Sequence, residues 1–81
     1  MPVFYRSRGY DFVVIPGDHA PAHVHIEGEG GYVKAWLGDG EVEDWSVYGK
    51  VSKSTARKLI KDLNANIDKA WDCWNEFGGS R

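Results

Sequence analysis

The sequence predicts an α+β domain, in which a small, mostly antiparallel sheet of four to five strands packs against one long C-terminal helix. Short β-prone segments separated by glycine-containing turns fill the first 50 residues. The last third changes to a helical spacing of apolar residues. A helix that is apolar on one side needs a sheet to cover, and the preceding strands provide one. We therefore interpret residues 1–81 as a single domain, with a β meander at 1–50 and an amphipathic helix at 52–77.

Five segments of the first half have the composition of strands, and each is bounded by turn-forming residues. They span residues 3–6, 10–15, 23–27, 32–37 and 42–48, the last as a strand or an irregular edge. Side chains alternate between the two faces of a strand. His23 and His25 are therefore expected on one face of the sheet, and Val24 and Ile26 on the opposite face under the helix.

The helix is predicted from apolar residues that recur at offsets of three and four, which form one stripe over about six turns. The stripe consists of Ala56, Leu59, Ile60, Leu63, Ile67, Ala70, Trp71, Trp74 and Phe77. Ser52 or Ser54 can cap its start, and Gly78-Gly79 supplies a stop at its end.

Composition narrows the class of protein. No apolar run approaches the roughly 18 residues of a membrane span, so we expect no membrane partner. Cys73 is the single cysteine and cannot form an intramolecular disulfide. Together with the absence of a signal-peptide pattern, this favours a cytoplasmic protein.

Charge is divided unevenly along the chain, although the net charge is only −2. Residues 11–44 contain eight acidic residues and one base, whereas residues 50–61 contain five bases and no acid. Three of these bases recur every fourth residue, which predicts a basic ridge along the exposed side of the helix start. The ridge, a candidate contact for nucleic acid or for an acidic protein, comprises Lys50, Lys53, Arg57, Lys58 and Lys61.

All three histidines of the chain lie within seven residues, as His19, His23 and His25. Histidine titrates near neutral pH and is the commonest metal ligand, so this cluster is the best candidate functional site. His19 lies on the loop before the strand and can fold back over His23 and His25. Asp18 is adjacent and can hold one imidazole through a ring N–H.

The cluster has four interpretations. The histidines brace a loop around Pro21; or all three bind a divalent metal such as zinc, because His-x-His on a strand is a workable metal pair. Alternatively, they act as general acid and base in phosphodiester cleavage, with Lys34 or an arginine steadying the phosphate. In the fourth interpretation they belong to a protein–protein contact.

Aromatic residues suggest a second feature of the same surface. Tyr32, Lys34 and Trp36 alternate with Val33 and Ala35, so they are expected on one strand face. If that face also bears the histidines, rings and imidazoles form one exposed patch, which marks a contact surface on a small domain.

The element Asp-His-Ala-Pro-Ala-His-Val-His at residues 18–25 resembles the hallmark of a family of small bacterial proteins of unknown function. The resemblance extends over residues 31–37 and over the Trp-x-x-Trp-x-x-Phe helix end at residues 71–77. It implies a compact α+β protein that is often encoded next to a second small protein. Members are sometimes labelled toxin–antitoxin-like or regulatory.

No complete catalytic constellation is evident, which favours a small protein-binding or regulatory protein of a toxin–antitoxin-like or phage and mobile-element type. Binding is expected through Tyr32, Lys34, Trp36, Lys53, Arg57 and Lys61. The alternative is a histidine-dependent or metal-assisted nuclease that uses His19, His23 and His25; the sequence does not decide whether the protein is an enzyme.

Overall fold

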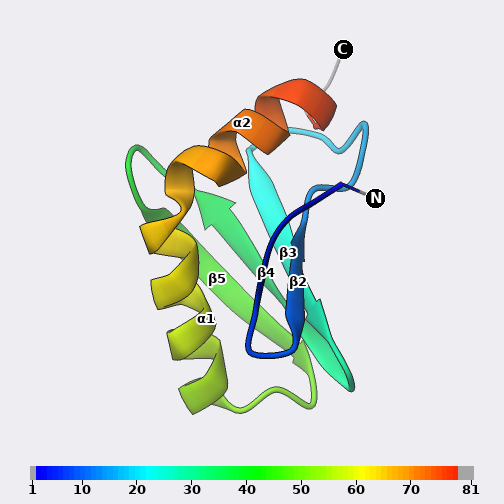
Figure 1. Cartoon of the computed structure of the whole chain (residues 1–81), viewed down its shortest axis with the longest axis vertical. Helices are drawn as coiled ribbons and strands as arrows, with labels where there is room; N and C mark the ends of the chain where they lie inside the picture. Colours follow the sequence, from blue (N-terminus) through cyan, green and yellow to red (C-terminus); the bar gives the residue numbers. More distant parts are fainter. Residues whose placement is uncertain (1, 79–81) are drawn as a thin grey trace.

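The computed structural model describes residues 2–78 and contains a five-stranded antiparallel sheet and two helices (Figure 1). The α+β class and the five strands agree with the sequence-based prediction. Gly79, half of the expected stop, lies outside the described residues. The elements are β1 (Val3–Ser7), β2 (Tyr10–Val13), β3 (His23–Gly28), β4 (Gly31–Leu37), β5 (Val42–Gly49), α1 (Lys53–Ala65) and α2 (Ile67–Phe77).

The sheet is a simple meander, because its strands pair in the order in which they occur along the chain. Both helices lie on one face of it (Figure 1). Val24 and Ile26 of β3 are fully buried on this face, together with Leu59 and Leu63 of α1. We call the opposite face of the sheet the open face; the helices leave it uncovered except at its end, where Trp74 of α2 packs on His23. Among the described residues no helix is long and apolar enough to cross a membrane.

The single long C-terminal helix expected from the sequence is wrong, because the chain breaks at Asn66 into α1 and α2. Asn66 has φ −124° and ψ 26°, outside the helical region, and its side-chain amide donates a hydrogen bond to the carbonyl of Asp62 at 2.9 Å. Asparagine side chains compete in this way with the backbone hydrogen bonds of a helix. The break turns α2 across the end of the sheet, where Trp74 and Cys73 become buried.

Asp62 of α1 fixes the β1–β2 turn to the helix. One carboxylate oxygen accepts hydrogen bonds from the Ser7 hydroxyl at 2.6 Å and from Arg8 Nε at 3.0 Å. The Ser7 hydrogen bond is the main cause that lowers the pKa of Asp62 below its ordinary value of 3.8; burial opposes it, and Arg8 lowers it further. Since the Arg8 side chain is 47% exposed, its ion pair is screened by water and contributes less.

Replacing Asp62 by asparagine is expected to lower the free energy of unfolding at pH 7 by about 1 kcal/mol. A carboxyl whose pKa is depressed in the folded state stabilises the fold above its unfolded pKa and loses that contribution as the pH falls. The difference between wild type and Asp62→Asn should therefore shrink as the pH falls below about 4. Urea unfolding of both proteins at several pH values measures this difference in the free energy of unfolding. The exposed Asp72 gives the control Asp72→Asn, and an equal, equally pH-dependent loss there would contradict this role of Asp62.

Candidate functional site

Strand β3 brings His23 and His25 together on the face of the sheet opposite Val24 and Ile26. Their ring centroids are 5.5 Å apart, with the planes inclined at 69°. The alternation predicted from the sequence is therefore confirmed. The two imidazoles lie side by side because residues two apart on a strand share a face.

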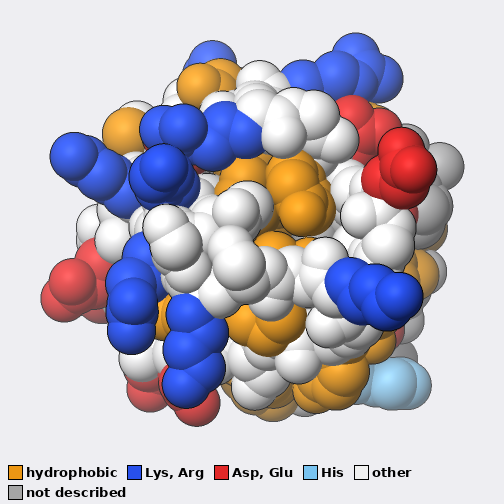
Figure 2. Space-filling view, turned by 90° about the horizontal axis from the view of Figure 1, so that it is seen from below, with side chains coloured by type: hydrophobic (Ala, Val, Ile, Leu, Met, Phe, Trp, Pro, Cys, Tyr) orange, Lys and Arg blue, Asp and Glu red, His pale blue; other side chains and the backbone are white. Residues whose placement is uncertain are grey.

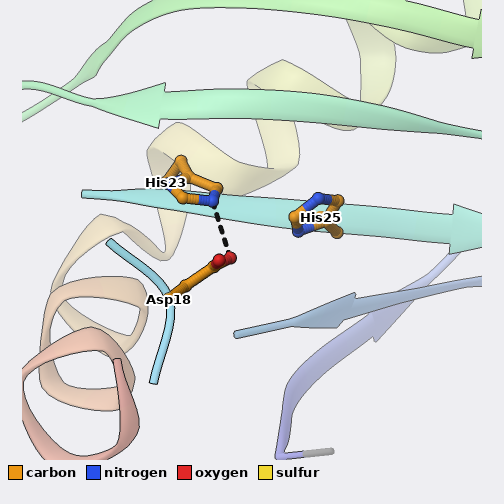
Figure 3. Close-up of side chains that lie close together, drawn as sticks. All are labelled: Asp18, His23 and His25. Carbon is orange, nitrogen blue, oxygen red and sulfur yellow. Dashed lines mark hydrogen bonds and ion pairs between the residues drawn. The ribbon is translucent and has the colours of Figure 1, made fainter. Parts of the chain in front are cut away.

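Asp18 reaches this pair from the loop between β2 and β3, and its carboxylate points toward the two rings (Figure 3). Its Oδ2 lies 2.7 Å from Nε2 of His23. Asp18 therefore holds one of the imidazoles, as expected from the sequence. One donor atom from each of Asp18, His23 and His25 lies within 4.8 Å of the others. We call these three residues the Asp–His cluster; it is the group of possible metal ligands among the described residues.

His23 is held on both of its ring nitrogens. Its Nδ1 lies 2.9 Å from the carbonyl oxygen of Pro21, and its ring packs on Trp74 of α2 with centroids 5.4 Å apart. A carbonyl only accepts hydrogen bonds, so Nδ1 carries a proton and donates it. Nε2 faces a carboxylate, which also only accepts when ionised. A positive centre, either a proton or a metal ion, must therefore lie between Nε2 and Asp18.

His25, unlike His23, has a ring nitrogen without a hydrogen-bond partner within the described part of the chain. This nitrogen is Nδ1, which is buried. Burial lowers the pKa of His25 below its ordinary value of 6.5, and the neighbouring His23 lowers it further. Asp18 and Glu27 act in the opposite direction. At neutral pH the ring is therefore uncharged and offers a nitrogen lone pair.

The three histidines named from the sequence do not lie in one group. His19 is exposed on the loop and is not part of the Asp–His cluster, in which Asp18 takes the third place. His23 is only 7% exposed, so the cluster is partly covered rather than open to water. Sequence spacing could not choose between Asp18 and His19, since the loop conformation decides which side chain turns inward.

The aromatic residues expected on the same face continue from the cluster. Tyr32 contacts His25, with ring centroids 5.5 Å apart, and stacks on Tyr48 at 4.8 Å. Lys34 places its ammonium group 4.9 Å from the centroid of Trp36. Tyr48, which is 42% exposed, was missed by the sequence analysis. No local sequence pattern indicates it, because its place beside Tyr32 depends on the register of β5 on β4.

A shallow depression of about 320 Å³ lies at the end of the open face near His23. It is lined by Pro21, Trp36, Glu43 and Asp44. Trp36 pairs with both His23 and Asp44 in the sheet, so the depression adjoins the Asp–His cluster. An indole ring beside two carboxylates is suited to a cationic side chain.

The basic ridge forms a separate surface. All five of its side chains are exposed, on α1 or immediately before it. Figure 2 shows the end of the molecule at which α1 begins, with most of its Lys and Arg side chains on the left of the view and hydrophobic side chains exposed near its centre. Lys53, Arg57 and Lys61 thus lie away from Tyr32, Lys34 and Trp36, because α1 packs on the opposite face of the sheet.

Fold and site together define a small α+β protein with a carboxylate–histidine cluster on the open face of an antiparallel meander. The chain belongs to the family described as a domain of unknown function, DUF4160, which matches residues 9–74. This range includes the Asp–His cluster, Tyr48 and the basic ridge. Comparison with curated proteins found no match, and comparison with solved structures found none.

Proposed function

We propose that this protein acts by binding a partner protein through the open face of its sheet, in a regulatory, toxin–antitoxin-like role in the cytoplasm. The observation that carries the proposal is the row of half-buried and exposed rings of His25, Tyr32 and Tyr48 on the open face, away from the contact of Trp74 with His23. Tyr and Trp are enriched at protein interfaces, because they bury much area and lose little conformational freedom.

The charge around this face favours a basic partner. Glu43 and Asp44 are exposed at the rim of the depression, and Glu27 lies on the strand of the Asp–His cluster. Trp36 already attracts the ammonium group of Lys34, so its ring is suited to a Lys or Arg side chain of the partner. The same acidic rim would repel an RNA backbone. A nuclease that uses the histidines is therefore the second candidate function, and it stays a prediction.

The test uses the small protein that, by the resemblance, is encoded next to this one. Size-exclusion chromatography of the mixed pair should show a complex that weakens at high salt. Glu43→Lys and Tyr48→Ser change exposed side chains of the proposed contact, and each should weaken the complex at least about tenfold, as loss of an anchor residue does.

The matched control is Lys58→Glu, a charge reversal of similar size on the basic ridge. It should leave the complex intact if the open face is the contact. Absence of a complex with the neighbouring protein, or a complex that only Lys58→Glu disrupts, would contradict the proposal.

A further inference from the structure

We propose that the Asp–His cluster binds one divalent first-row transition metal ion, such as zinc. The ligands would be Nε2 of His23, a carboxylate oxygen of Asp18 and a ring nitrogen of His25. This inference does not depend on partner binding. It concerns two of the histidines singled out in the sequence, with Asp18 in place of His19.

The first argument is the conflict between two acceptors. His23 uses the proton on Nδ1 for the carbonyl of Pro21, which leaves a lone pair on Nε2 in the neutral ring. That lone pair faces the carboxylate of Asp18 at 2.7 Å. Two acceptors at this distance repel each other unless a cation lies between them. A metal ion would remove the conflict by bonding to both acceptor atoms.

The second argument is the unsatisfied nitrogen of His25. Buried polar atoms are nearly always hydrogen-bonded, and an exception requires an explanation such as an ion. Nδ1 of His25 is such an exception within residues 2–78. The ring lies beside His23, and one of its nitrogens is within 4.8 Å of the ligand atoms of His23 and Asp18. A bound metal ion would give a nitrogen of this ring a partner, either in its present orientation or after the ring turns over.

The third argument is the way in which the ligands are supported. Metal-bound histidines usually donate their second ring N–H to a carbonyl or carboxylate, which fixes the ring and its tautomer. Pro21 provides this carbonyl for His23, and Trp74 packs against the ring. Zinc bonds of about 2.0–2.1 Å place tetrahedral ligand atoms about 3.4 Å apart. Asp18 lies on a loop, so its carboxylate can adjust to this spacing more readily than the strand can.

Two imidazoles and one carboxylate select the class of metal. Imidazole suits zinc, iron, copper and nickel, whereas magnesium and calcium prefer all-oxygen sites. Three protein ligands also leave a fourth position for water or for a group of another molecule. The site would adjoin the depression at Trp36, since Trp36 pairs directly with His23 in the sheet.

The experiment titrates the metal-free full chain with Co²⁺, whose visible absorption reports coordination, and measures bound Zn²⁺ by equilibrium dialysis with elemental analysis. We expect one ion per chain for wild type. Asp18→Asn and His25→Gln should each weaken Co²⁺ binding at least about tenfold. His23→Gln should do the same, but the ring is buried; the other two variants therefore decide if it fails to fold by circular dichroism.

His19→Gln is the matched control, because His19 is the remaining histidine and lies outside the cluster. It should bind Co²⁺ as tightly as wild type. No stoichiometric binding of either ion at micromolar protein would overturn the proposal and leave a proton between His23 and Asp18. A loss in His19→Gln as large as that in His25→Gln would also overturn it, since the ion would then not be held by the Asp–His cluster as proposed.

Discussion

Replacing Gly49 by alanine is expected to destabilise the protein by about 3 kcal/mol or more, through two independent costs. Gly49 has φ +79°, a left-handed conformation that residues with a β-carbon rarely adopt. An alanine β-carbon at this position would also lie 2.5 Å from the carbonyl oxygen of Gly30 and 2.9 Å from Cα of Gly31. Both neighbours are backbone atoms, one in the β3–β4 turn and one in the first residue of β4, so neither can move without disturbing the sheet.

The close approach of Gly49 to the backbone of Gly30 and Gly31 belongs to the hydrogen-bonded pairing of the sheet. The backbone N–H of Lys50 donates to the carbonyl of Gly30 at 2.9 Å, and Gly49 pairs with Gly31 at the end of the β4–β5 ladder. An added methyl group would therefore separate the end of β5 from the β3–β4 turn. Thermal unfolding followed by circular dichroism should show a midpoint lowered by more than about 12 °C.

Gly40 separates the two costs. Its φ is +81°, almost the same as that of Gly49, but an added β-carbon would meet nothing within 4 Å. Gly40→Ala should therefore lose only the conformational cost, about 1 kcal/mol. Equal losses in Gly40→Ala and Gly49→Ala would mean that the contact with Gly30 is unimportant.

The second large effect is expected for His23→Ala in the metal-free protein, with a loss of about 2–3 kcal/mol. The substitution removes an imidazole that bonds the Pro21 carbonyl and Asp18 and packs on Trp74. The carboxylate of Asp18, which is 29% exposed, loses its cationic or proton-sharing partner. Urea unfolding measures the change, as a lower midpoint with an unchanged slope.

His19→Ala provides the comparison, since His19 is exposed one residue from Asp18 and should cost less than about 0.5 kcal/mol. The double variant Asp18→Ala/His23→Ala should be less destabilised than the sum of the two single variants, because both remove one shared interaction. Additive losses would show that the contact of His23 with Asp18 does not stabilise the fold.

The strands and their faces could be predicted from the sequence because alternation is a local property. The placing of His23 and His25 on one face, with Val24 and Ile26 on the other, needed only the period of a strand. The C-terminal helix was predicted as one element because its apolar stripe continues through Asn66. The break depends on backbone and side-chain hydrogen bonds at Asn66, which hydrophobic spacing does not report.

By itself, the sequence determined the α+β class, a sheet of four to five strands, the shared face of His23 and His25 and the exposed basic side of α1. Each of these follows from the period of apolar and polar residues along a single element. Only the tertiary structure decided that Asp18 rather than His19 joins the two histidines, and that Tyr48 extends the aromatic row. Both depend on distant segments: the path of the β2–β3 loop, whose Gly17 N–H donates to the carbonyl of Phe77 in α2, and the register of β5 on β4. Contacts across separate elements depend on the packing of the whole chain, which no local pattern records.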